Sequence, residues 1–129
     1  MGLSRTAVIT FRIALTVAVV AISYLAFTDR QIPVVILVWD KLKHAAAFAA
    51  LAMLVDFAFP AGRFGAAKML WLIGYGVMIE VVQYFLPYRE PSTLDVLADC
   101  VGIALYALAI PVLKHLPGLR LRWQPPGGD

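Results

Sequence analysis

The hydrophobic and polar positions of this chain are arranged in long blocks. Four blocks are almost wholly apolar and cover residues 13–27, 45–59, 69–86 and 94–113, and a shorter one covers residues 34–39. A membrane-spanning helix needs about 20 mainly apolar residues, so the four longer blocks reach or approach that length. The short block is expected to lie at a membrane interface. The pattern therefore predicts an all-α polytopic membrane protein, a bundle of four transmembrane helices.

The two ends of the chain need separate interpretations. Residues 1–115 are expected to form one transmembrane domain, and residues 116–129 a basic and then Pro/Gly-rich cytoplasmic tail that is disordered. The first apolar block is either a spanning helix or a cleaved signal peptide, because Arg5 and Arg12 precede it and small residues at 21–23 resemble a cleavage site. We favour the spanning helix, because the rest of the chain has the pattern of a membrane protein and needs no cleavage.

The composition agrees with a membrane location. Of the 129 residues, 62% are hydrophobic and 15% are charged, and the mean hydropathy is +0.84. Soluble domains have about 45–50% apolar residues, so this chain lacks the charge to cover a water-facing surface. No basic run with interleaved aromatic residues is present, which makes nucleic acid a poor candidate partner. The single cysteine, Cys100, excludes an intrachain disulfide and a cysteine-built metal site.

Basic residues are distributed unequally between the two sides of the predicted bundle. Seven fall on the side of the chain termini: Arg5, Arg12, Arg63, Lys68, Lys114, Arg120 and Arg122. Four fall on the opposite side: Arg30, Lys41, Lys43 and Arg89. Loops rich in Lys and Arg remain in the cytoplasm. Both termini are therefore expected to be cytoplasmic, and the protein is expected to be a multi-pass protein of the plasma (inner) membrane.

Several polar residues interrupt the apolar blocks or lie directly beside them. An ionisable group at the centre of a bilayer costs about 2.5 kcal/mol or more, so such groups are expected to face the bundle interior or a wet cavity. Three pairs share a helical face at a spacing of three or four residues: Asp40 with His44, Glu80 with Gln83, and Asp95 with Asp99. Gly102 and Tyr106 continue the face of the last pair. In the predicted topology these pairs and Arg89 all lie in the outer half of the bundle. Asp56 lies in the other half, and Arg63 is its expected partner.

In these positions the chain resembles the VanZ-like family of small membrane proteins. The shared motifs, in chain order, are D-K-x-x-H (Asp40, Lys41, His44), E-x-x-Q (Glu80, Gln83), a loop arginine (Arg89) and D-x-x-x-D-x-x-G (Asp95, Asp99, Gly102). The family usually has asparagine where this chain has Asp99, and often an aromatic residue where this chain has Ala45. It is named for a protein that raises resistance to the glycopeptide teicoplanin. The resemblance implies a membrane location and an outer polar site more firmly than it implies a reaction.

The polar pairs also have structural explanations. Asp40 and His44 suit a metal site or an acid–base pair, but a carboxylate at a helix start is more simply a cap. Asp95 follows Ser92 at the spacing of a capping box, so capping is its simpler role. Asp99 lies one turn deeper, where capping does not explain it.

Three functional hypotheses remain open. In the first, an outer-leaflet polar cavity binds an anionic cell-envelope or lipid-linked component and modulates envelope and glycopeptide susceptibility. In the second, the same site is an acid–base or metal-assisted hydrolase or transferase. In the third, the protein is a structural membrane partner without a ligand. We place binding ahead of catalysis, because the sequence has no nucleophile in a recognisable setting.

The site residues divide according to these hypotheses. The candidate catalytic residues are Glu80, His44 and Asp99, and the candidate ligand-binding residues are Asp40, Lys41, Gln83, Arg89 and Asp95. Whether a metal or another cofactor is bound stays open, as does enzymatic activity. The partners expected are membrane lipid and a lipid-linked cell-wall precursor. A homodimer is also plausible, because four short helices enclose little volume.

Overall fold

The computed structural model describes residues 2–28 and 37–125, without the side chains of residues 37–40. Within these residues the fold is all-helical, as the apolar blocks predict. The helices are α1 (Arg5–Phe27), α2 (Leu37–Ala58), α3 (Ala66–Tyr84), α4 (Thr93–Leu113) and the short 3-10 helix η1 (Leu119–Trp123).

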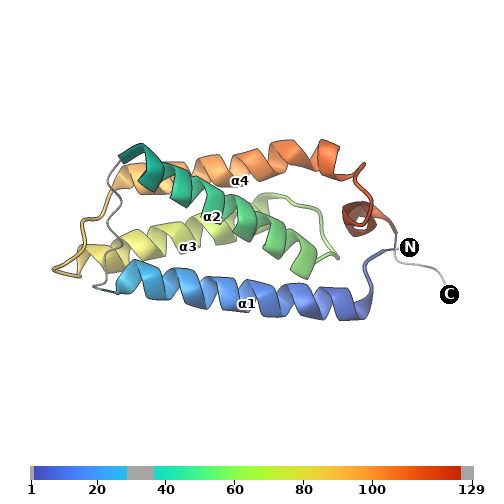
Figure 1. The fold of residues 1–129 in the computed structure, drawn as a ribbon, viewed down its shortest axis with the longest axis horizontal. Coiled ribbons are helices and arrows are strands. Elements are labelled where there is room, and N and C mark those ends of the chain that lie inside the picture. Colours follow the sequence, from blue (N-terminus) through green and yellow to red (C-terminus); the bar gives the residue numbers. More distant parts are fainter. Residues whose placement is uncertain (1, 29–36, 126–129) are drawn as a thin grey trace.

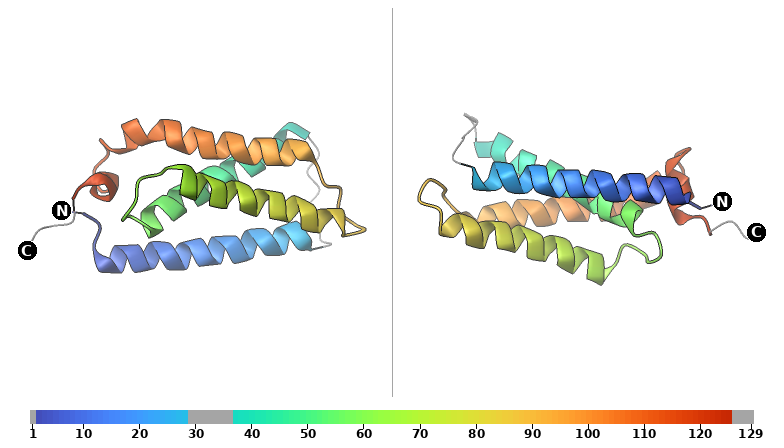
Figure 2. Two further views of the ribbon diagram at one scale, coloured as in Figure 1. Left: turned by 180° about the vertical axis from the view of Figure 1, so that it is seen from behind. Right: turned by 90° about the horizontal axis from the view of Figure 1, so that it is seen from below.

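The helices run lengthwise between two ends of an elongated bundle (Figure 1). The start of α1, the end of α4 and η1 lie at one end, which we call the near end. The end of α1, the start of α2 and the loop between α3 and α4 lie at the other, which we call the far end. Helix α2 crosses the bundle obliquely, and it packs most extensively against α4 and then against α1 (Figure 2).

Three of the described helices, α1, α3 and α4, are long and apolar enough to cross a membrane. Their outward faces expose large apolar side chains such as Val17, Leu70 and Leu108, as expected for contact with lipid. Helix α2 has a similar length of 22 residues. It differs because it carries Lys41, Lys43, His44 and Asp56. Its place in the bundle therefore depends on the polar partners that the other helices provide for these groups.

The centre of α2 supplies much of the core. Phe48, Leu51, Ala52 and Val55 are buried there against residues of α1, α3 and α4. The alanines of α2 allow one helix to approach very closely, as small residues do in membrane bundles. A side chain at Gly102 of α4 would collide with the backbone of α2 at the carbonyl of Ala45. This contact sets the distance between the two helices that carry most of the polar groups.

Two helix starts differ from expectation. Helix α1 begins at Arg5, well before the apolar block, and the hydroxyl of Ser4 accepts a hydrogen bond from the N–H of Ala7 at 3.1 Å as an N-cap. Helix α2 begins at Leu37, so the short apolar block is in part the first turn of this helix. Asp40 is therefore inside the helix and is not its N-cap. The side chains of Asp40 and Trp39 lie outside the described residues.

Candidate functional site

A group of charged side chains from three helices meets at the far end. We call it the far-end cluster, and its members are Lys41 and His44 of α2, Glu80 of α3, and Asp95 and Asp99 of α4. The ammonium of Lys41 pairs with Oδ1 of Asp95. Asp95 and Asp99 are both buried, as is Tyr106 further along the same face. The face predicted on α4 is therefore a real buried face, and it points toward α2.

His44 lies between the two carboxylates of α4. Its Nδ1 is 3.1 Å from Oδ1 of Asp99, and its Nε2 is 3.7 Å from Oδ2 of Asp95. The side chain of His44 is 26% exposed and that of Asp99 is 4% exposed. An imidazole held in this way has a fixed ring orientation, with one nitrogen hydrogen-bonded to a carboxylate. Asp99 from the neighbouring helix therefore orients His44. The side chain of Asp40, which the sequence paired with His44, lies outside the described residues.

Glu80 reaches the cluster from α3 and caps the start of α4. Its Oε2 accepts a hydrogen bond of 2.8 Å from the N–H of Ser92, the N-cap residue. In a capping box the acceptor of this bond is the acidic residue three positions into the same helix, which would be Asp95. The prediction that Asp95 serves as a cap is wrong, because its carboxylate is directed to Lys41 and His44. The hydroxyl of Ser92 makes no cap bond either.

The second oxygen of Glu80 distinguishes this carboxylate from the others. Oε1 is buried and has no hydrogen-bond partner among the described residues. Asp95, Asp99 and His44 are near enough to interact with Glu80 electrostatically. A buried oxygen without a donor costs about 1–3 kcal/mol, and more when the group is charged. Glu80 therefore has an unused acceptor at the point where three helices meet.

The charges within the far-end cluster do not balance. It contains three carboxylates, and its cations are Lys41 and, when protonated, His44. A protonated imidazole and the ammonium would neutralise Asp95 and Asp99, their direct partners. Glu80 then carries the remaining negative charge, which suits a hydrogen-bond donor or a cation better than it suits a phosphate.

Gln83 and Arg89 lie near this end, where they bind the end of α1. Together with Tyr88 they donate hydrogen bonds to the last carbonyl groups of α1, which have no partner within the helix. The bonds run from Gln83 to Ala26 at 3.0 Å, from Tyr88 to Phe27 at 2.6 Å, and from Arg89 to Thr28 at 3.1 Å and Leu25 at 2.5 Å. Among the described residues, Arg89 therefore binds the end of α1 and forms no ion pair with the far-end cluster.

A second polar cluster lies at the near end, and the sequence predicted only one of its members. We call it the near-end cluster. Its centre is Asp56, which is fully buried and accepts hydrogen bonds from Lys68 at 2.8 Å, Tyr106 at 2.7 Å and Arg122 at 2.7 Å. The expected pairing with Arg63 is not among these contacts, and Arg63 is exposed. Tyr106 was predictable from its face on α4, whereas no pattern indicated Arg122.

Part of the basic tail is helical. Residues 119–123 form η1 and Arg122 is 6% exposed, so this part of the tail is ordered and packed against the bundle. Residues 126–129 lie outside the described residues.

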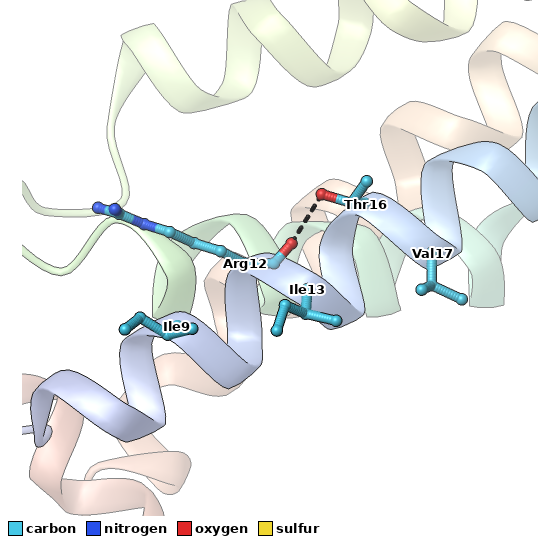
Figure 3. A pocket seen from close by; sticks show the side chains of 5 residues that line it. All are labelled: Ile9, Arg12, Ile13, Thr16 and Val17. Carbon is cyan, nitrogen blue, oxygen red and sulfur yellow. Dashed lines mark hydrogen bonds between the residues drawn. The ribbon is translucent and has the colours of Figure 1, made fainter.

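Two open hollows lie on the outer face of α1, away from both clusters. One of about 280 Å³ is lined by Ile9, Arg12, Ile13, Thr16 and Val17 (Figure 3). The other, of about 420 Å³, is lined by Thr16, Val17, Val20, Ala21 and Tyr24. In Figure 3 the Arg12 side chain extends away from the hollow, and its Nε donates to the carbonyl of Ala58 at 3.0 Å. These shallow apolar surfaces suit lipid chains, and we assign no polar site to them.

Metal-binding geometry is not present among the described side chains. No three His, Cys, Asp or Glu residues in that part of the chain are arranged so that they could hold one ion. In the far-end cluster the Lys41 ammonium occupies one side of Asp95, where a cation would otherwise approach.

The comparison with protein families decides the affiliation of the chain. The model of the VanZ/LLP1 family matches residues 4–114, a range that contains all four long helices and the far-end cluster. The chain belongs to the VanZ/LLP1 family. No curated protein and no solved structure matches it. As a VanZ/LLP1 member with helices apolar enough to span a bilayer, it is a membrane protein. The match ends before η1, so the matched range does not include Arg122.

Proposed function

We propose that the protein binds a membrane-embedded component of the cell envelope at the far-end cluster and thereby modulates susceptibility to glycopeptides. The observation that carries this proposal is the unpartnered, buried Oε1 of Glu80. A structural ion-pair network gains nothing from such an atom, whereas a binding site uses it to receive a donor from the ligand. The glycopeptide part of the proposal is supported only by the namesake of the family.

The chemistry of the cluster favours a ligand that donates hydrogen bonds. Three carboxylates face Lys41 and, when protonated, His44, so an incoming ammonium, hydroxyl or amide N–H group meets an acceptor, and an incoming phosphate meets excess negative charge. Arg89, the residue best suited to hold a phosphate, donates to the end of α1. Among envelope components we therefore infer a head group with a primary amine, in preference to the anionic component that the sequence suggested.

Nanodiscs of defined lipid composition test this inference. Phosphatidylethanolamine and phosphatidylcholine share a phosphate, but only the former has N–H donors, and phosphatidylglycerol is anionic. We expect enrichment of phosphatidylethanolamine around the purified protein, measured by mass spectrometry of co-purified lipid. The Glu80→Gln protein should lose it, by about tenfold or more if one charge-assisted hydrogen bond disappears.

Glu80→Gln suits this test because its amide oxygen can still accept the bond from Ser92. The matched control is Glu90→Gln, since Glu90 is exposed in the loop next to the cluster. Preferential binding of phosphatidylglycerol would reinstate an anionic ligand. Equal binding of all three lipids by both variants would contradict a site that recognises hydrogen-bond donors. In cells that carry the protein, Glu80→Gln should shift the inhibitory concentration of teicoplanin toward that of the deletion strain, and Glu90→Gln should not.

A second function is favoured by one specific contact. The bond of 3.1 Å between His44 and Asp99 resembles the histidine–carboxylate pair of general acid–base catalysis, and Glu80 provides a second carboxylate nearby. A membrane-embedded hydrolase or transferase would use this pair to move a proton on a bound ligand. In that case the Asp99→Asn variant would retain lipid enrichment but lose the cellular effect. If the protein only binds its ligand, the same variant would keep both.

A further inference from the structure

The side chain of Arg122 is inserted into the near end of the bundle from a short helix that follows α4. Its Nη2 donates to Oδ1 of Asp56 at 2.7 Å, and its Nε donates to the backbone carbonyl of Asp56 at 2.6 Å. Nη1 donates to the carbonyl of Pro60 at 3.1 Å, and Nη2 also donates to the carbonyl of Gly62. One guanidinium therefore binds a buried carboxylate and three backbone carbonyls where α2 ends.

The other partners of Asp56 come from two further helices. Lys68 of α3 donates to Oδ1, and Tyr106 of α4 donates to Oδ2. Lys68 also donates to the carbonyls of Phe59 and Gly62 at 2.8 and 2.9 Å. Asp56 is 0% exposed, so its charge depends entirely on these partners. Removing one partner of a buried ion pair leaves an uncompensated charge, which is strongly destabilising.

Apolar contacts reinforce this attachment. Trp123, next to Arg122, packs edge-on against Phe57 with the ring centroids 5.7 Å apart. Phe57 in turn contacts Phe11 of α1 at 4.9 Å. The segment 119–123 therefore contacts α2 by charge at Asp56 and by aromatic packing at the next residue, Phe57. We call this segment the strap.

We propose that the strap is the element that keeps α2 in the bundle. Helix α2 is not among the described helices that are apolar enough to span a membrane, and Asp56 lies in its last turn. A lone carboxylate at that depth would favour withdrawal of α2 toward water. Arg122 and Lys68 neutralise it, and Arg122 also binds the carbonyl of Asp56 in the last turn of α2. The strap lies outside the range that matches the family, so the proposal depends on the contacts in this chain.

Thermal unfolding of the full chain in detergent tests the proposal. Cys100 is the single cysteine and is partly buried on α4, so a thiol-reactive fluorophore reports unfolding without engineering. Arg122→Gln removes the charge and most of the hydrogen bonds. We expect its unfolding midpoint to fall by roughly 10 °C or more, as for a broken buried ion pair. Arg120→Gln is the matched control, because Arg120 is an exposed arginine on the same short helix.

A second variant separates charge neutralisation from general damage. In Asp56→Asn/Arg122→Gln the buried charge is absent, so we expect the midpoint to recover a large part of the loss. If Arg122→Gln cannot be purified, recovery of folded protein in the double variant supports the proposal equally. The proposal is overturned if Arg122→Gln melts within about 2 °C of Arg120→Gln. It is also overturned if the double variant is no more stable than Arg122→Gln, or if neither can be purified while Arg120→Gln can.

Discussion

Two glycines, one on α3 and one on α4, determine how closely the polar groups approach one another. Gly76 and Gly102 both lie where a side chain would meet a neighbour: Gly76 would meet Oδ2 of Asp99 at 2.8 Å, and Gly102 would meet the Ala45 carbonyl. Glycine at these positions gives up helix propensity, which costs about 0.8–1.0 kcal/mol relative to alanine in a helix interior. The gain is close backbone packing, which lets His44 on α2 reach Asp99 on α4.

Gly102→Ala is therefore expected to destabilise the protein by about 1–3 kcal/mol, because the added methyl group must push α2 away from α4. The measurement is thermal unfolding, monitored by the reaction of Cys100 with a thiol-reactive fluorophore. Gly74→Ala is the matched control, since Gly74 is also helical but has no atom within 4 Å of an added methyl group. That variant should be neutral or slightly stabilised. Equal behaviour of the two variants would mean that the α2–α4 spacing is not set by Gly102.

At the scale of the elements, both ends of the bundle use the same device. Long side chains from distant segments satisfy the last carbonyl groups of a helix: Gln83, Tyr88 and Arg89 at the end of α1, and Arg12 and Arg122 at the end of α2. Such carbonyls have no partner within the helix and no water within a bilayer. Cations are also favoured at a helix C-terminus by the helix dipole. Each capping side chain therefore joins two elements as well as completing one.

This arrangement predicts that Glu80 and Arg89 act independently. Arg89→Gln should lower stability by about 1.5–3 kcal/mol through loss of charge-assisted bonds to α1. Glu80→Gln should have a smaller effect, since an amide oxygen can still accept from Ser92. In the double variant the two effects should add within about 0.5 kcal/mol, as expected for groups that share no partner. A larger coupling energy, measured by chemical or thermal denaturation, would place Arg89 in the far-end cluster after all.

At the scale of the whole molecule, the two polar clusters lie at opposite ends of one helix pair. Asp95 and Asp99 of α4 receive the charges of α2 at the far end, and Tyr106 of α4 reaches Asp56 at the near end. Between the clusters the contact is apolar and tightly packed around Gly102 and Phe48. The far-end cluster can therefore act on one side of a membrane, separated from the strap on the other side.

The direction of the molecule in the membrane stays a prediction from its basic residues. Both termini are expected in the cytoplasm, which places the far-end cluster outside. In a Cys100→Ala background, Glu90→Cys should react with a membrane-impermeant thiol reagent in intact cells. Arg63→Cys should react only after permeabilisation. Both positions are exposed, so access to the reagent depends on the side of the membrane. Labelling of Arg63→Cys from outside would reverse the topology and move the proposed site to the cytoplasm.

The sequence by itself determined the four long helices and the buried polar face of α4. Blocks of about 20 apolar residues require helices in a bilayer, because every backbone group must be satisfied within its own segment. Spacings of three and four residues placed Asp95, Asp99 and Tyr106 on one face. Both results follow from local geometry and hold regardless of how the helices pack.

Only the tertiary structure decided which polar group pairs with which. Asp56 binds Arg122, which is 66 residues away, rather than nearby Arg63, and Glu80 caps a helix that its neighbour Asp95 was expected to cap. Arg89 binds the end of α1, although the sequence suggested it as a ligand-binding residue. Long charged side chains have many candidate partners at similar sequence distances. The choice among them depends on helix crossings, which are set by the contact of glycine and alanine backbones and by apolar packing around them.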